Sequence, residues 1–188
     1  MRIIAGSLRS RTLETPPGLA TRPTSDRLRE TLFNVLAPRI QGAAFLDLYA
    51  GSGAVGIEAL SRGAARVGFV EQEPKALKAL RGNLERLGIS SGFRIDSSSV
   101  AASLKHLGKG NERFNLVFLD PPWDAGAQYA ATLGLLGGSA SELLADGALV
   151  IAEHRRKERL EDRYGSLERT RLHEQGDAAL SFYAAAAG

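Results

Sequence analysis

The 188-residue sequence contains no cysteine, only three histidines, one methionine and one tryptophan. Without cysteine the chain cannot form disulfides, bind zinc through thiolates or use a thiol nucleophile, and three scattered histidines argue against a metal cluster. We therefore expect no metal and a reducing compartment. The chain also lacks the roughly 20-residue apolar run that spans a bilayer and the apolar core of a signal peptide. Together these absences predict a cytoplasmic protein that does not contact a membrane.

Basic charge is small in total but uneven in its distribution. The formal net charge is +3, yet residues 1–39 hold seven arginines against three acidic residues, a net of +4. Arginine carries a planar fork of donors that suits phosphate groups and base edges. Arg2, Arg9 and Arg11 lie on or beside a predicted hairpin and are candidates for contact with RNA. The alternative is that this segment is simply a solvated charged surface.

Alternating apolar strands and amphipathic helices predict one α/β domain of the Rossmann-like kind, with a mostly parallel seven-stranded sheet and helices on both faces. The predicted strands are residues 44–50, 67–71, 93–96, 114–119, 148–153, 167–173 and 179–184. The predicted helices run from Asp26 until Pro38 stops the segment, and over 54–62, 74–87, 98–107 and 128–136. A small hairpin is expected from 2–5 and 11–13, and the charged stretch 154–163 is interpreted as a solvated helix or loop.

The chain is organised around residues 45–56, where an apolar run breaks into Gly51, Gly53 and Gly56 and continues as a helix. Glycine adopts positive φ without strain and lets a ligand approach the backbone, and the helix then points free N–H groups toward that ligand. Twenty residues after the first glycine comes Glu71, at the end of the next strand, where a carboxylate can bind the two hydroxyls of a ribose. This pattern predicts a cofactor that contains a nucleoside.

Asp47 helps to choose between cofactors. It lies four residues before the first glycine, where its carboxylate would repel the pyrophosphate of a dinucleotide and attract a cationic amino-acid group. The pattern resembles motif I of the S-adenosylmethionine-dependent methyltransferases. An NAD-dependent oxidoreductase is an alternative, disfavoured by Asp47 and by the lack of an evident acid or base for hydride transfer.

A second motif, Asp120-Pro121-Pro122-Trp123, follows the fourth strand. The two prolines remove backbone donors and fix φ, so this segment presents a carboxylate and carbonyl oxygens as a rigid set of acceptors. Such acceptors suit the NH₂ group of a nucleobase, and Trp123 would stack on the base. A base inside a helix cannot enter such a pocket, so the target must be single-stranded, looped or flipped out.

Together these motifs resemble those of the bacterial 16S rRNA (guanine-N2)-methyltransferases of the small-subunit methyltransferase D type, and the resemblance covers nearly the whole chain. It rests on Met1-Arg2-Ile3-Ile4-Ala5-Gly6, on the region from Arg22-Pro23-Thr24 to Phe33, on Asp47-Leu48-Tyr49-Ala50-Gly51-Ser52-Gly53 and on Asp120-Pro121-Pro122-Trp123. The resemblance implies a class I fold, S-adenosylmethionine as methyl donor, and 16S rRNA or a small-subunit particle as partner.

The resemblance also implies roles for individual residues. Cofactor binding would fall to Asp47, Gly51 and Gly53 at the methionine end, Glu71 at the ribose, Asp96 at the adenine, and Thr24 and Arg27 as a cover over cofactor or substrate. Catalysis would fall to Asp120, Pro121, Pro122 and Trp123. Residues 1–40 would form an extension that covers RNA or cofactor, and 41–188 the methyltransferase domain, acting as a monomer. The chain departs from the family where Trp123 replaces the usual Phe or Tyr, and where an alanine tail replaces basic residues.

Two further functions fit parts of this pattern. A DNA adenine-N6 methyltransferase would use the same Asp-Pro-Pro-aromatic motif, because that motif recognises an amine without distinguishing guanine from adenine. The chain has no separate DNA-recognition domain, which weighs against this reading. A nucleotide- or RNA-binding module without catalysis would need neither motif complete, whereas both are complete here.

Overall fold

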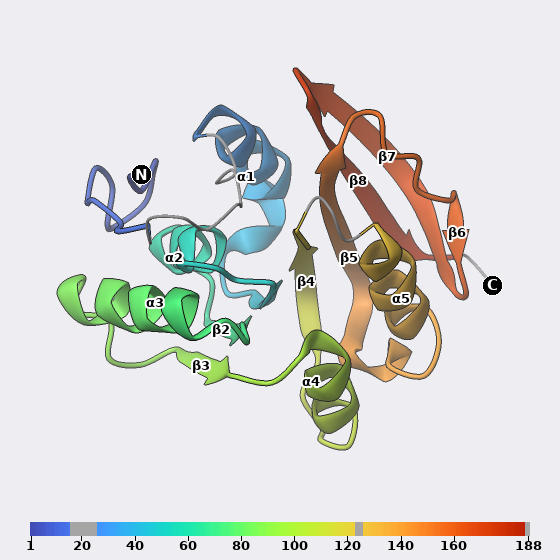
Figure 1. Cartoon of the computed structure of the whole chain (residues 1–188), viewed down its shortest axis with the longest axis horizontal. Coiled ribbons are helices and arrows are strands. Elements are labelled where there is room, and N and C mark those ends of the chain that lie inside the picture. The colour runs from blue at the N-terminus through green and yellow to red at the C-terminus, as the bar shows by residue number, and fades with distance from the viewer. Residues whose placement is uncertain (16–25, 123–125, 187–188) are drawn as a thin grey trace.

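The computed structural model describes residues 1–15, 26–122 and 126–186, in which helices cover both faces of a central sheet (Figure 1). The helices are α1 (Asp26–Ile40), α2 (Ala54–Ser61), α3 (Pro74–Arg86), α4 (Val100–Leu107), α5 (Ala127–Leu136) and the short 3₁₀ helix η1 (Ser141–Leu143). The strands are β1 (Ala44–Leu48), β2 (Arg66–Val70), β3 (Phe93–Asp96), β4 (Phe114–Leu119), β5 (Leu144–Arg155), β6 (Arg163–Tyr164), β7 (Leu167–Gln175) and β8 (Ala178–Ala185).

The strand order is β3-β2-β1-β4-β5-β8-β7-β6. The first five strands are parallel, and β8, β7 and β6 add an antiparallel extension beyond β5. All five residues of β1 are buried, as expected for a central parallel strand that is covered on both faces. β2 pairs with one side of β1 and β4 pairs with the other. The direction in which successive strands are added to the sheet therefore reverses between β1 and β4. In open α/β sheets such a reversal is where ligands bind.

Two layers of apolar side chains hold the helices against the sheet. Successive strand residues point to opposite faces, so Phe45 packs with α1, α2 and α3, whereas its neighbour Leu46 packs with α4 and α5. The same alternation separates Phe118 from Val117 on β4. This two-sided core confirms the predicted α/β architecture.

The predicted count of seven strands is wrong by one. The additional strand, β6, pairs Arg163 with Glu168 and Tyr164 with Leu167, within and just after a charged stretch that we expected to be a solvated helix or loop. Gly165 makes this pairing possible. It has a φ of +58° and lies against the carbonyl of Gly137, so a Cβ atom at this position would be 2.2 Å from the carbonyl oxygen. A two-residue charged strand has no alternating pattern that a sequence could reveal.

The prediction that Pro38 stops the first helix is also wrong, because α1 continues to Ile40. Pro38 lacks the N–H that would donate to the carbonyl of Asn34. Asn34 is on the exposed side of the helix, where water can bind this carbonyl instead. Ile40 is buried and packs in the core, which holds the final turn in place.

The N-terminal residues form the predicted hairpin as a single antiparallel bridge between Arg2 and Thr12, outside the main sheet. The turn of this hairpin presses on α2, because a Cβ atom on Gly6 would lie 1.8 Å from the carbonyl oxygen of Ser61. Ser61 also donates its hydroxyl to the carbonyl of Ala5 at 2.6 Å. The hairpin is therefore fixed to the helix that follows the glycine turn (Figure 1).

Glu58 of α2 is the centre of this attachment. Its fully buried carboxylate accepts hydrogen bonds from the backbone N–H groups of Ile4 at 2.8 Å and Ala5 at 3.0 Å, and from Nε of Arg62 at 2.7 Å. It also forms an ion pair with buried Arg29 of α1, at 3.8 Å between Nε and Oε2. One carboxylate thus joins the N-terminal hairpin, α1 and α2.

No helix in residues 1–15, 26–122 and 126–186 is long and apolar enough to cross a membrane.

We expect Glu58→Ala to lower the free energy of unfolding by about 3 to 5 kcal/mol, because it removes the buried anion that pairs with buried Arg29 and the acceptor of the Ile4 and Ala5 N–H groups. Urea denaturation followed by circular dichroism measures this change. Glu30→Ala is the matched control, since Glu30 is exposed on α1, and it should change stability by no more than about 0.5 kcal/mol. Equal losses for the two variants would contradict the central role of Glu58.

Candidate active site

The glycine turn joins the end of β1 to the start of α2. Gly51 and Gly53 have φ values of +58° and +84°, which side chains rarely adopt. The two glycines differ in what surrounds them. A Cβ atom on Gly53 would lie 2.3 Å from Cδ1 of Leu80, whereas a Cβ atom on Gly51 would meet nothing within 4 Å. Gly53 is thus required for packing, and Gly51 faces open space that a ligand can enter.

Two polar side chains hold this turn from neighbouring elements. Glu71, after β2, accepts a hydrogen bond from the N–H of Gly51 at 2.8 Å, and its other oxygen accepts from the N–H of Glu73 at 2.8 Å. Asn83, fully buried on α3, donates to the carbonyl of Ser52 at 2.9 Å; its Oδ1 also accepts from the N–H of Glu14 and its Nδ2 donates to the carbonyl of Glu14. Sequence reasoning found Glu71 but missed Asn83, which looks like an ordinary residue of an amphipathic helix.

Asp47 lies beneath the turn and is 1% exposed. Its Oδ2 accepts the N–H of Gly56 at 2.8 Å, which orients the first turn of α2. Burial raises the pKa of Asp47 to about 7, with a contribution from the charge of Glu71 and against the opposing effect of the Gly56 hydrogen bond. Its charge state therefore changes near neutral pH.

Asp120 emerges beside this turn. Leu119 pairs with Leu48 of β1 and with Ala152 of β5, so the chain positions that follow, Asp120 and Glu153, meet at the same edge of the sheet. Oδ1 of Asp120 is buried and has no hydrogen-bond partner among the residues that the structure describes. Burial, with the neighbouring charges of Glu153 and Asp47, raises the pKa of Asp120 well above its usual range. The two predicted motifs therefore meet in one place.

Two tyrosines at this edge were not predicted. Tyr49 has φ +62°, unusual for a residue other than glycine, and its hydroxyl is 2.8 Å from the hydroxyl of Thr132 on α5. Tyr129, also on α5, is buried and donates its hydroxyl to the backbone carbonyl of Glu153 at 3.0 Å. Glu153 was missed as well, although its place directly after a strand core, like that of Asp120, is a signal that could have found it.

The remaining predicted site residues are more dispersed. Asp96, half-buried at the end of β3, accepts the N–H of Ser98 at 2.9 Å. Partial burial would raise the pKa of Asp96, but Ser98, Ser103 and the charge of His106 together outweigh it and the pKa is lowered. Arg27 is exposed in the first turn of α1. Thr24 and Trp123 lie outside the described residues, and Pro121 is buried while Pro122 is exposed.

The three arginines predicted to contact RNA are all exposed on the N-terminal hairpin. Arg2 forms a loose ion pair with Asp26, at 3.9 Å, and Arg11 donates to the backbone carbonyl of Arg86 at 3.2 Å. They do not lie among the buried acids, but the hairpin that carries them is fixed to α2.

These residues fit a cationic nucleoside cofactor better than a metal ion. The described part of the chain contains no group of three or more His, Asp or Glu residues that could hold a metal. The site instead combines open space over Gly51, a carboxylate at the end of β2, and a buried carboxylate oxygen of Asp120 without a partner. A ligand with a positive charge and N–H donors would relieve the buried negative charge.

Comparison with known proteins agrees with this geometry. The family described as "Conserved hypothetical protein 95" matches residues 1–184. The chain is 34% identical to "Putative rRNA methyltransferase YlbH" of Bacillus subtilis over 97% of this chain and 98% of that protein. It is 40% identical to "Ribosomal RNA small subunit methyltransferase D" of Escherichia coli, over 81% of this chain and 74% of that protein.

A solved structure, "Putative methyltransferase yhhF from Escherichia coli", superposes with a TM-score of 0.84 at 34% identity, covering 100% of this chain and 99% of that one. The sequence match and the shared fold extend over the hairpin, the glycine turn and the Asp-Pro-Pro segment alike. The chain therefore belongs to the conserved hypothetical protein 95 family and to the family of the ribosomal RNA small subunit methyltransferases D, and it has the class I methyltransferase fold.

Proposed function

We propose that this protein transfers a methyl group from S-adenosylmethionine to the exocyclic N2 amino group of a guanine in 16S rRNA of the small ribosomal subunit. The observation that carries the proposal is the buried, unpartnered Oδ1 of Asp120, which lies beside the glycine turn and begins an Asp-Pro-Pro segment. The named relatives support rRNA as the substrate, and the family resemblance supports N2 of guanine as the target atom.

The cofactor would lie across the ends of β1, β2 and β3. The open space over Gly51 would admit its methionine end, whose positive charge the buried carboxylate of Asp47 would attract. Glu71 orders the turn through the Gly51 N–H and would bind the ribose hydroxyls. Asp96, at the end of the neighbouring β3, would contact the adenine, and Thr24 and Arg27 would cover the ligand. When bound, the cofactor supplies an electrophilic methyl group on a sulfonium.

The protein must make a poor nucleophile attack. The lone pair of a guanine amino group is delocalised into the ring, and two acceptors, Oδ of Asp120 and the carbonyl of Pro121, would favour the pyramidal nitrogen that can attack in line. Trp123 would stack on the base. Methylation of this nitrogen, which would leave the donor as a neutral thioether, would release one proton, and Asp120 with its raised pKa would accept it. Asp120 would have to be ionised beforehand, and a positive charge bound beside it would favour that form.

The RNA would approach over the N-terminal extension, residues 1–40. Arg2, Arg9 and Arg11 are exposed on a hairpin that Glu58 and Ser61 fix to α2, so phosphates bound there would lie at a constant position relative to the glycine turn. Residues 41–188 would form the methyltransferase domain. We place the protein in the cytoplasm, where ribosomal particles are its substrate. We expect it to act as a monomer.

Asp120→Asn should reduce methyl transfer at least about 100-fold. The amide is a weaker hydrogen-bond acceptor than the carboxylate, and it cannot accept the departing proton. The measurement is the rate of labelled methyl transfer from S-adenosylmethionine to small-subunit particles, with the product nucleoside identified by mass spectrometry. Asp146→Asn, on an exposed residue, is the matched control. Cofactor affinity should stay within a few fold in both variants, and a parallel loss of cofactor binding in Asp120→Asn would refute the separation of roles.

Gly51→Ala should weaken S-adenosylmethionine binding about tenfold or more, because its methyl group would occupy the space that the ligand enters. Gly42→Ala is a closely matched control, since Gly42 also has positive φ (+73°) and nothing within 4 Å of a Cβ atom. Both substitutions should cost about 1 kcal/mol in backbone strain. Calorimetric titration that finds the same cofactor affinity in both variants would argue against a ligand at Gly51.

Cofactor affinity should rise with pH across neutrality. An acid whose pKa is about 7 is roughly one-tenth ionised at pH 6 and roughly three-quarters ionised at pH 7.5, and only the ionised form of Asp47 attracts a cation. We therefore expect affinity to increase between about fivefold and tenfold over this range. Asp47→Asn keeps an acceptor for the Gly56 N–H and should flatten the profile. An unchanged pH dependence in this variant would assign the titration to another group.

A further inference from the structure

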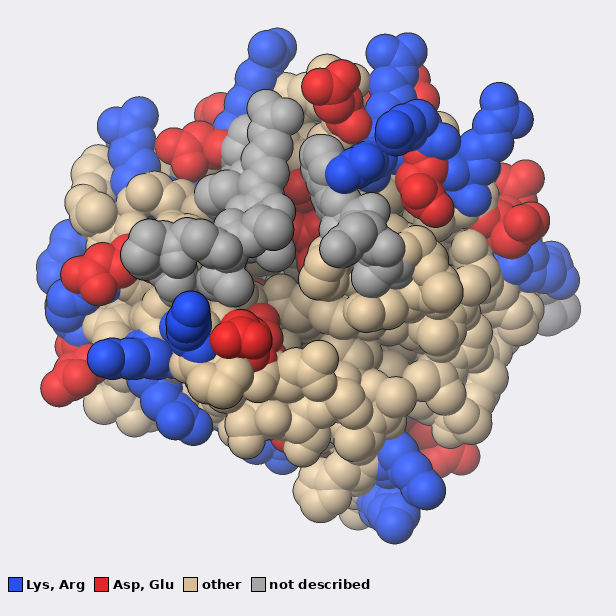
Figure 2. All heavy atoms as spheres, viewed as in Figure 1, with Lys and Arg blue, Asp and Glu red and all other residues tan. Residues whose placement is uncertain are grey.

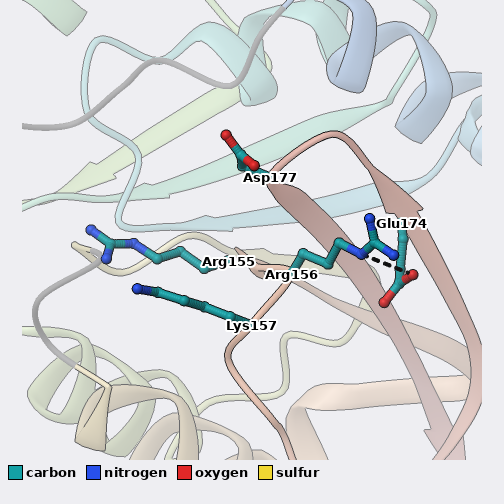
Figure 3. Close-up of a pocket in the computed structure, with 5 residues that line it drawn as sticks. All are labelled: Arg155, Arg156, Lys157, Glu174 and Asp177. Carbon is teal, nitrogen blue, oxygen red and sulfur yellow. Dashed lines mark ion pairs between the residues drawn. The ribbon is translucent and has the colours of Figure 1, made fainter.

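A hollow of about 520 Å³ opens where β5 ends. The described residues that line it are Arg155, Arg156, Lys157, Glu174 and Asp177 (Figure 3). Arg156 and Lys157 are exposed, and Arg155 is half-buried. The lining carries three positive and two negative charges. These cations belong to the charged stretch that has no role in the proposed chemistry.

The hollow borders the candidate active site. Arg155 lies two residues after Glu153, which meets Asp120 at the edge of the sheet. On its other side, the turn that follows the hollow touches the start of α5, because a Cβ atom on Gly126 would lie 3.1 Å from Oε1 of Glu158. The segment after Asp120 leads into this same helix. The cations thus lie next to the place where a target base would enter.

The basic side chains that line the hollow point in two directions. Arg156 turns toward β7 and forms an ion pair with Glu174, at 3.2 Å between Nε and Oε2, and its backbone N–H donates to the carbonyl of Asp177 at 2.8 Å. Arg155 and Lys157 extend together the opposite way (Figure 3). Lys157 forms no ion pair with any residue in the described ranges. The ion pair uses Nε of Arg156, and the exposed side chains of Arg156 and Lys157 both bring positive charge to the hollow.

A base bound at Asp120 would remain attached to its strand, so the phosphates on either side of it would lie close to the Asp120 carboxylate. The hollow begins two residues beyond Glu153, and its cations can pair with phosphodiester oxygens. Lys and Arg side chains also stand out over the β7–β8 side of the face in Figure 2. An acidic protein segment would be attracted too, but nothing about the active site delivers one there.

We propose that this hollow, which we call the basic hollow, binds the RNA phosphates adjacent to the target nucleotide. The proposal rests on the proposed function, because it takes the RNA strand to enter at Asp120. It adds a second phosphate-binding surface to the N-terminal arginines, on the opposite side of the glycine turn along the sheet.

The test is the double variant Arg156→Ala with Lys157→Ala. We expect KM for unmethylated small-subunit particles to rise about tenfold, with kcat and cofactor affinity within about twofold of the wild type. Filter binding to naked 16S rRNA should weaken as well, and the slope of log affinity against log salt should fall by about 1.4, the value for two lost single-strand phosphate contacts.

The matched control is Lys105→Ala with Lys109→Ala, which removes the same charge from exposed residues at the end of α4 and just beyond it, at the opposite edge of the sheet. It should leave KM and the salt slope unchanged. Glu174→Gln with Asp177→Asn removes the two competing acids and should lower KM about threefold. This opposite change also separates an electrostatic role from loss of folding.

Two results would overturn the proposal. If the Arg156/Lys157 variant matches the Lys105/Lys109 control on both substrates, the basic hollow binds no RNA. If affinity falls for particles but not for naked 16S rRNA, the partner is a ribosomal protein. A wild-type enzyme that methylates neither substrate would refute the proposed function instead, and rRNA binding by the same variants would still decide the proposal about the basic hollow.

Discussion

Burial of negative charge at the carboxyl edge of the parallel sheet is the constraint on which this site depends. Asp47 lies near the end of β1, Asp120 directly follows β4 and Glu153 lies near the end of β5, and the charges of Asp47 and Glu153 both act on Asp120. Removal from water and mutual repulsion both oppose ionisation, so the pKa values of Asp47 and Asp120 are raised. Such an arrangement costs stability in the free protein and favours a ligand that brings positive charge. The site is thus prepared for a cationic cofactor before any ligand binds.

Contacts outside the site offset the loss of stability that this arrangement causes. Glu58 joins the hairpin, α1 and α2, and Asn83 joins the glycine turn to the chain at Glu14. Both side chains are fully buried with their acceptor and donor groups satisfied by partners far away in the sequence. Because these groups are packed and paired, the turn that carries Gly51 keeps its geometry even though the backbone there adopts unusual φ values.

The residues proposed for catalysis and those proposed for RNA affinity carry opposite charges and lie in different places. Buried acids cluster around the end of β4, while the exposed cations lie on the hairpin before the sheet and on the turn after β5. Phosphate contacts orient a nucleic acid but carry little information about its sequence. Under the proposed function, selection of the methylated atom would depend on the acceptors of Asp120 and Pro121, and the two basic surfaces would fix the strand that presents it.

Several features could be predicted because they are local. The strand–glycine–helix pattern around Gly51, the position of Glu71 and the Asp120-Pro121-Pro122 segment all depend on short-range backbone preferences, and β3 and β4 were predicted with their observed bounds. The topology rule for parallel strands then brought the two motifs together. The family resemblance added the cofactor and the substrate class, which geometry alone leaves open.

Other features exist only because the chain is folded. The roles of Glu58 and Asn83 depend on partners more than 50 residues away, and no local pattern distinguishes them from surface residues of a helix. β6 and the last turn of α1 are held by packing that overrides weak or unfavourable local preferences. The raised pKa of Asp47 likewise comes from burial and from neighbours that its own sequence position does not reveal. The sequence by itself determined where the chemistry-bearing residues stand along the chain, and the tertiary structure decided their charge, support and surroundings, because those depend on long-range burial.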